Sequence, residues 1–188
     1  GLSLLMVPLD APGVRVTALP TLDGDRLSAI ELRGVLEGTA LRLAAEAGVS
    51  PEKIQHIKSL IAQIDAGFSA AGDPPDLEAY SGLNEQFHDD IADLCPSGIV
   101  RSELQRVKSL PFASPSAFVF RRRESQTMTQ SIVIAQAHHH AMIEAIERRE
   151  GARAEALARE HALIARRNLE EKALAPGEGN PALALIVD

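Results

Sequence analysis

The sequence predicts an all-α protein, an antiparallel bundle of about six helices preceded by a short β-hairpin. Ala, Leu, Glu and Arg, which all favour helix, are abundant in the chain. Apolar residues recur at intervals of three and four, and Gly and Pro fall between the periodic stretches, where they end one helix and begin the next. Because 45% of the residues are hydrophobic but only 3% are aromatic, aliphatic side chains must build the core.

The composition argues against several classes of protein. A net charge of -7 and a pI near 5.4 do not suit a chain that itself binds nucleic acid. A single cysteine, Cys95, excludes an internal disulfide and fits a reducing compartment. No apolar run reaches the roughly 18 residues of a membrane span, and the opening GLSLLMVP lacks the basic residues of a signal peptide. We therefore expect a cytoplasmic protein without a membrane segment.

The N-terminal residues predict a different structure from the rest of the chain. Residues 2–19 read as two short strands around a DAPG turn, and the alternation of Val14 and Val16 in the second arm is typical of a strand. An isolated hairpin is at best marginally stable, so we expect this one to pack on another part of the protein.

Start and stop signals divide the remaining chain into helices. Gly48 is a stop signal for the first, and Ser50 with Pro51 supplies an N-cap and a first-turn proline for the second. Pro111 ends the fourth helix, and Gly151 separates the last two. The expected helices span about 25–47, 51–70, 76–95, 97–110, 125–149 and 151–174.

Three of the six histidines lie on the apolar faces of predicted helices. His139 is at the centre of an apolar stripe formed by Ile132, Ala135, Met142, Ile143 and Ile146. Its neighbours His138 and His140 are rotated by about 100° to either side. His161 and His88 have similar positions on the last helix and the third helix. The HHH run therefore contains one inward-facing histidine with two flanking ones.

Spacing indicates that these inward-facing histidines meet. His139 and His161 are equidistant from Glu150, beside the expected turn, so they lie level in an antiparallel hairpin. Asn84 is one helical turn before His88 on the same face. Together these residues offer nitrogen and oxygen donors suited to a first-row divalent metal.

Two other interpretations of the same residues are open. The histidines could be hydrogen-bonded core residues without a metal. Glu85 and His88 also form half of a Glu-x-x-His di-iron motif, but the chain has no second copy of it, so this indication is weak.

Three stretches of the sequence carry a resemblance to a known family. They are IELRGVLEGTALRLAAE (30–46), LNEQFHDDIADL (83–94) and HHAMIEAIERREGARAEALAREH (139–161). Together they resemble the FCD-type effector-binding domain of GntR-family transcriptional regulators, FadR subfamily, over residues 25–172. The resemblance implies an antiparallel helical bundle, homodimeric in many members, with a metal at the floor of a small-molecule pocket. A winged helix-turn-helix precedes this domain in the family, and residues 1–20 resemble its wing hairpin.

The resemblance also implies a set of metal ligands. Carried over by position, they are Asn84, His88, His139 and His161. An Asp is common in the family where this chain has Asn84, and an amide coordinates only through a neutral oxygen. A divalent ion held by neutral ligands keeps its full charge, which favours an anionic effector completing an open site.

Arg33 and His140 are the expected ligand-binding residues. Arg33 lies beside the apolar face of the first helix, four residues before Glu37. It could act as a carboxylate clamp over the metal, or form a plain ion pair with Glu37. His140 flanks the inward-facing histidine and is a candidate to contact the residues that hold the metal.

The leading hypothesis is a sensing domain without catalytic activity. We expect a wing-like remnant at 1–20, a helical effector-binding and dimerisation domain at 25–175, and a tail at 176–188. The domain would bind a divalent transition metal (zinc, nickel or similar) and a small organic or sugar carboxylate. It would act as a homodimer on operator DNA through an upstream winged helix domain.

Two alternative functions remain. One is a helical metalloenzyme in which the metal activates water and Glu85 or His140 acts as the base. The other is a metal-free helical dimerisation module in which the histidines fill the core.

Overall fold

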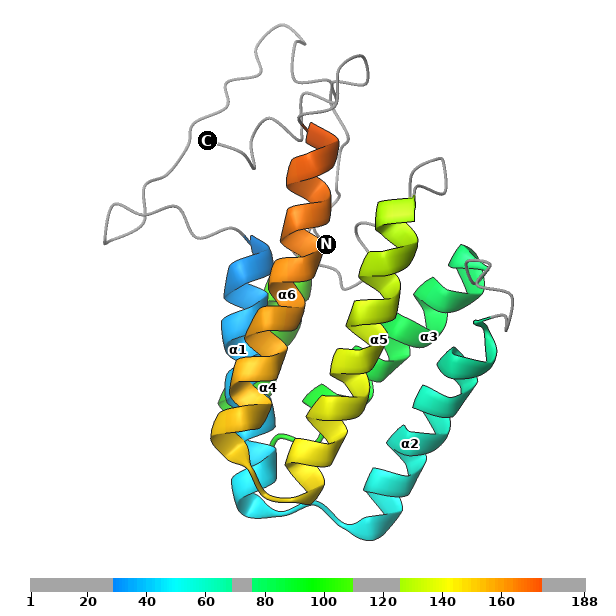
Figure 1. Cartoon of the computed structure of the whole chain (residues 1–188). Helices are drawn as coiled ribbons and strands as arrows, with labels where there is room; N and C mark the ends of the chain where they lie inside the picture. The colour runs from blue at the N-terminus through cyan, green and yellow to red at the C-terminus, as the bar shows by residue number, and fades with distance from the viewer. Residues whose placement is uncertain (1–28, 69–75, 110–125, 174–188) are drawn as a thin grey trace, which may run out of the picture.

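The computed structural model describes residues 29–68, 76–109 and 126–173, which form a helical bundle (Figure 1). Its helices are α1 (Ala29–Ala47), α2 (Pro51–Ala66), α3 (Leu77–Ala92), α4 (Gly98–Lys108), α5 (Gln126–Glu147) and α6 (Gly151–Ala173). The prediction of an all-α bundle is confirmed for this part of the chain, which contains no strand. The predicted hairpin at residues 1–20 and the tail at 176–188 lie outside the described residues. None of the described helices is both long and apolar enough to cross a membrane.

The bundle is organised around α1, α5 and α6. α1 and α6 are the most extensively packed pair, and α5 packs antiparallel to α6 through the short turn between them. Figure 1 shows α2 and α3 on the side of α5 away from α1. α2 contacts both α3 and α5, while α4 packs on α1. The core between these helices is mainly aliphatic, as predicted, with Phe87 of α3 fully buried in it.

Two glycines of α1 allow its close approach to α6. A Cβ at Gly34 would lie 2.5 Å from the Cβ of Ala162, and a Cβ at Gly38 would lie 2.9 Å from the carbonyl oxygen of Glu155. Both distances are too short for any side chain, so the two helix backbones are in direct contact. The small residues of α1 and α6 therefore fix how these helices cross.

Two helices end earlier than the sequence predicted. α2 ends at Ala66 rather than at about residue 70, because Gly67, a poor helix former, is its C-cap. α3 ends at Ala92, before Cys95, because Pro96 disfavours helical geometry in the residue that precedes it. The start of α3 was predicted well. The Asp76 side chain caps it by accepting the backbone N–H groups of residues 78 and 79.

The turn between α5 and α6 has a left-handed residue at its centre. Arg149 has a φ of 62°, a conformation that commonly ends a helix but is unusual for a residue other than glycine. Its guanidinium donates to the carbonyl oxygen of Glu46 at 2.9 Å. The turn is therefore attached to the last residues of α1.

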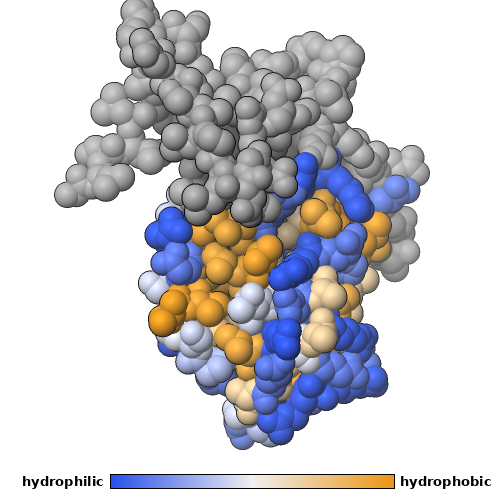
Figure 2. Space-filling view, turned by 90° about the vertical axis from the view of Figure 1, so that its left-hand side faces the viewer, coloured by the Kyte–Doolittle hydropathy of each residue, from blue (hydrophilic) through white to orange (hydrophobic). Residues whose placement is uncertain are grey.

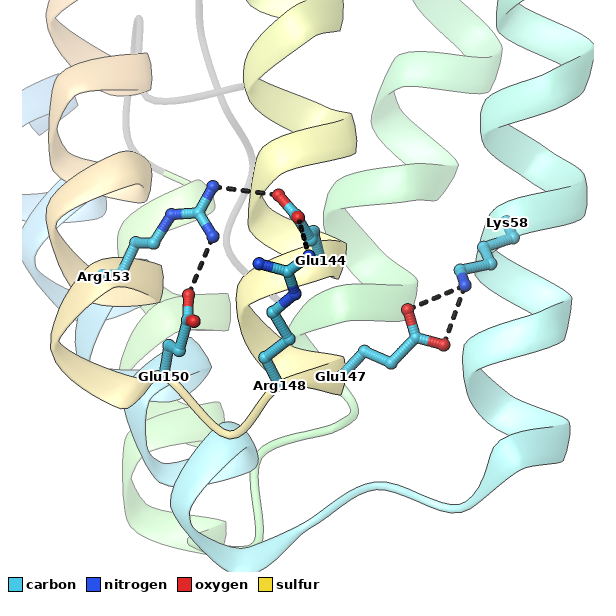
Figure 3. Close-up of polar contacts among 6 residues, drawn as sticks. All are labelled: Lys58, Glu144, Glu147, Arg148, Glu150 and Arg153. Carbon is cyan, nitrogen blue, oxygen red and sulfur yellow. Dashed lines mark hydrogen bonds and ion pairs between the residues drawn. The ribbon is translucent and has the colours of Figure 1, made fainter.

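Ion pairs join the same end of α5 to its neighbours (Figure 3). Glu144 accepts from Arg148 and from Arg153 of α6. Lys58 of α2 contacts both carboxylate oxygens of Glu147 at 2.8 Å. These side chains are largely exposed, so each pair contributes no more than about 1 kcal/mol. They link α2 and α6 to the C-terminal end of α5.

Candidate metal centre

Three buried histidines from three helices meet inside the bundle. His88 on α3, His139 on α5 and His161 on α6 have exposed fractions of 1%, 0% and 6%. One ring nitrogen of each lies within 4.8 Å of those of the other two. The Nε2 atoms of His88 and His161 are 3.1 Å apart. The ring centroids of His139 and His161 are 4.7 Å apart, which confirms that residues equidistant from the turn lie level.

Burial keeps two of these rings neutral. Desolvation lowers the pKa of His139 and that of His161 well below the usual value, and repulsion from neighbouring histidines lowers both further. At neutral pH each ring therefore has one nitrogen with a free lone pair. Neutral imidazole is the form that binds metals.

Glu37 of α1 orients His88. The Nδ1 of His88 donates to Oε1 of Glu37 at 2.5 Å, and both side chains are buried. Burial acts to raise the pKa of Glu37, but attraction to His88 and Arg33, together with the hydrogen bond, lowers it to about 2. In the neutral ring of His88, Nδ1 carries the proton of this bond and Nε2 carries the lone pair.

This contact was not predicted from the sequence, in which we considered Glu37 only as a partner of Arg33. A signal was nevertheless present. Glu37 lies four residues before Leu41 on the apolar face of its helix, and a buried carboxylate requires a cation or a hydrogen-bond donor. The periodicity indicates that such a partner is needed, but not which residue supplies it.

Gln136 of α5 is a hydrogen-bond partner of His139. The Nδ1 of His139 lies 2.9 Å from Oε1 of Gln136. The amide nitrogen of Gln136 donates to Oδ1 of Asp65 at 2.7 Å and to the carbonyl oxygen of Ile61 at 3.3 Å, both on α2. Gln136 is only 5% exposed. The sequence interpretation also missed this residue, although it is a polar side chain three positions before His139.

Several buried polar atoms around the histidines have no hydrogen-bond partner among the residues that the structure describes. They include Nε2 of His139, Nδ1 of His161, Oε2 of Glu37, and Nε and Nη1 of Arg33. Buried polar groups in proteins are nearly always satisfied, and a bound ligand or ion would satisfy this concentration of atoms.

Arg33 is a buried cation beside the histidines. It is 1% exposed; burial lowers its pKa, and the nearby Glu37 partly opposes that shift. Arg33 also lies near enough to His161 to help lower the pKa of that histidine. Since arginine stays protonated at neutral pH, its unsatisfied N–H groups are available to an anion.

The remaining predicted residues differ in how they relate to the cluster. Asn84 is buried one turn before His88, and the Tyr80 hydroxyl donates to its Oδ1 at 3.5 Å. Its role as a fourth ligand stays a prediction. The structure does not bring His140 into the cluster: this half-exposed side chain faces α2, where its Nε2 contacts Asp65 at 3.0 Å. Glu85 lies on the exposed face of α3.

The arrangement of donors fits a divalent transition metal. Two nitrogen ligands of one tetrahedral zinc ion lie about 3.3 Å apart, given Zn–N bonds of about 2.0–2.1 Å. The Nε2 atoms of His88 and His161 are 3.1 Å apart, which is a hydrogen-bond distance between the two rings and also close to this value. The unsatisfied Nε2 of His139 supplies a third donor. Three protein ligands leave coordination positions open, as in zinc sites that bind a further molecule.

Fold and site together describe an all-α domain that buries three histidines from three helices. The FCD domain family matches residues 28–163 of this chain. The chain therefore belongs to the FCD family, the effector-binding domain of GntR-family transcriptional regulators. No curated protein shows a significant match to the chain. The resemblance noted in the three sequence motifs is thus confirmed at the level of the family.

Proposed function

We propose that this chain is a metal-dependent sensor of small carboxylates within a GntR-family regulator. The observation that carries the proposal is the buried cluster of His88, His139 and His161, with unsatisfied atoms of Arg33 close by. Family membership supports an effector-binding role rather than catalysis. The proposal adds a chemical class of effector and an assignment of residues to this role.

In this proposal the three histidines hold a divalent transition metal such as zinc or nickel, and Asn84 is the candidate fourth ligand. The metal supplies a positive charge with open coordination positions for an anionic oxygen. Glu37 accepts a hydrogen bond from Nδ1 of His88, so Nε2 of the neutral His88 ring can present its lone pair to the metal without reorganising the ring.

Arg33 gives the site its preference for a carboxylate. A guanidinium presents parallel N–H groups that match the two oxygens of a carboxylate. The unsatisfied Nε and Nη1 atoms of Arg33 are buried, where such a contact is stronger than in water. A small organic or sugar acid with one carboxylate is the class of effector that these groups favour.

The proposal includes a homodimer that acts on operator DNA through an upstream winged helix domain. Leu32, Leu36 and Leu43 form a second apolar stripe on α1, facing away from its buried face, and each is partly exposed. On α4, which packs on α1, Ile99 is 80% exposed. Figure 2 shows broad apolar areas on the side of the molecule where α1 lies. These surfaces support pairing with a second copy of the chain.

The two alternatives have less support. A metalloenzyme would need a base beside the metal, but Glu85 and His140 both lie on exposed faces of their helices. In a metal-free module the histidines would satisfy one another, as His88 and His161 do through their Nε2 atoms, whereas Nε2 of His139 and Nδ1 of His161 have no partner among the described residues. Ligand sensing accounts for both observations.

Removing one histidine is expected to abolish metal binding. Wild-type protein loaded with zinc should retain about one ion per chain after dialysis, and His139→Ala should retain almost none, as measured by elemental analysis. His56→Ala is the matched control, because His56 is largely exposed and pairs only with Asp90 among the described contacts. If the wild type holds no metal, or if His139→Ala holds as much as the control, the metal-dependent sensor is wrong.

A change at Arg33 is expected to separate metal binding from effector binding. Arg33→Gln should keep zinc but bind small carboxylic acids about 10–100-fold more weakly, because it loses charge-assisted hydrogen bonds. Calorimetric titration with a panel of mono- and dicarboxylic acids measures this. Arg33→Lys, which keeps the charge but not the paired N–H geometry, should be intermediate. Equal affinities in all three proteins would contradict the proposed clamp.

A further inference from the structure

A continuous chain of hydrogen bonds connects the buried His139 to the surface of α2. It runs from Nδ1 of His139 to Gln136, and from Gln136 to Asp65. At its outer end, Asp65 and His140 lie on the wall of a groove of about 620 Å³ between α2 and α5. Only the inner end of this series of hydrogen bonds, at His139, belongs to the proposed metal centre.

We propose that Gln136 is a positioning residue that fixes the tautomer of His139, and that Asp65 is the anchor that fixes the orientation of Gln136. This inference deepens the proposed function, because it names the groups that prepare one metal ligand. The direction of the hydrogen bonds supports this inference. That direction is known because carboxylate and carbonyl oxygens only accept hydrogen bonds.

Asp65 determines the direction of its bond with Gln136, because a carboxylate can only accept hydrogen bonds. The Gln136 atom that lies 2.7 Å from Oδ1 of Asp65 must therefore be the amide nitrogen. The same nitrogen donates to the carbonyl oxygen of Ile61, which also only accepts. These two acceptors on α2 together leave one orientation for the Gln136 amide.

The orientation of the amide determines where the proton of His139 resides. Oε1 of Gln136 faces Nδ1 of His139 at 2.9 Å and accepts a hydrogen bond from it. In a neutral ring the proton is then on Nδ1, and Nε2 carries the lone pair. This Nε2 is buried and has no hydrogen-bond partner among the described residues. Gln136 thus makes the inward nitrogen of His139 a ligand rather than a donor.

The means of orientation differs between the two histidines. His88 is oriented by a buried carboxylate on α1, whereas His139 is oriented by an amide that is itself held by α2. A neutral amide can serve here because its other end is fixed by a carboxylate nearer the surface. The position of α2 consequently affects the ring of a residue on α5.

Removing the amide is expected to change both the tautomer and the zinc affinity. In Gln136→Met, which keeps the length of the side chain, Nδ1 of His139 loses its acceptor. Nitrogen-15 NMR of the metal-free protein should show the Nε2–H tautomer of His139 becoming populated, whereas wild type shows Nδ1–H alone. Zinc affinity should fall by about 10–100-fold, the usual effect of losing the partner of a ligand. Gln63→Met on the exposed face of α2 is the matched control and should match wild type.

A pair of reciprocal changes tests the role of Asp65. Gln136→Glu alone places a carboxylate opposite Asp65 and should weaken zinc binding through the displaced side chain. Gln136→Glu with Asp65→Asn exchanges donor and acceptor, so the introduced carboxylate again accepts from His139. The double variant should regain the Nδ1–H tautomer and most of the lost affinity. The double variant also tests the positioning role of residue 136 if Gln136→Met fails to fold.

The outcomes distinguish this inference from the proposed function. Unchanged Nδ1–H signals and unchanged zinc affinity in Gln136→Met would overturn the positioning role while leaving the metal centre intact. A double variant no better than Gln136→Glu would overturn the role of Asp65. If wild type binds no zinc, the proposed function fails, but the tautomer of His139 in the metal-free variants still tests the positioning role.

Discussion

The Glu37→Leu variant is expected to lose about 3–5 kcal/mol of folding free energy, the usual cost of removing one member of a buried charged pair. Glu37 accepts from His88 at 2.5 Å and is the main opposing charge for the buried Arg33. Its loss leaves the guanidinium uncompensated and the Nδ1 of His88 without an acceptor. Urea unfolding followed by circular dichroism measures the change in free energy.

Zinc affinity of this variant should also fall, by about 10–100-fold, because His88 loses the group that fixes its tautomer. Glu37→Gln keeps an acceptor for His88 and should retain more of the affinity. Combining Glu37→Leu with Arg33→Met removes the uncompensated charge and should recover part of the stability. An additive loss in this double variant would show that Arg33 and Glu37 do not interact.

The Gly34→Ala variant is expected to destabilise the bundle by about 1–3 kcal/mol, the usual cost of overpacking a core. The added Cβ would lie 2.5 Å from the Cβ of Ala162, which has no rotamer by which to move away. This cost exceeds the gain of up to about 1 kcal/mol that alanine brings to a helix interior. Thermal and urea unfolding measure the net effect.

The same substitution on α3 provides the control. A Cβ at Gly82 would have no heavy atom within 4 Å, so Gly82→Ala should stabilise the protein by about 0.5–1 kcal/mol. Adding Ala162→Gly to Gly34→Ala removes the clashing methyl group and should restore part of the stability. A neutral effect of Gly34→Ala, or no rescue by Ala162→Gly, would show that α1 and α6 can separate at low cost.

The sequence predicted the helices and part of the site because both depend on local spacing. The apolar stripe around His139 and its distance from the α5–α6 turn were enough to place it level with His161. The same spacing placed His88 on the buried face of α3. Periodicity of this kind depends on the sequence of one helix alone, so it can be identified without knowing which helices lie beside it.

The contacts that orient the histidines could not be predicted, because they join helices far apart in the chain. Glu37 and His88 are separated by 51 residues, and Gln136 and Asp65 by 71. Spacing along a helix gives the face of a residue but not its partner on another helix. For the same reason the flanking position of His140 did not reveal that it faces Asp65 on α2. The loss of the last turn of α2, by contrast, followed from the local properties of Gly67.

The glycine contacts between α1 and α6 determine which parts of the bundle are free to shift. Gly34 and Gly38 bring the two backbones into contact, and the short turn holds α5 to α6, so these three helices form a stiff unit. α3 packs mainly on α2 and only narrowly on α1. His88 therefore lies on the less extensively packed side of the cluster, where its bond to Glu37 is a main link between α3 and α1. We therefore expect a change in the separation of the three rings to displace α3 and α2 rather than to slide α1 along α6.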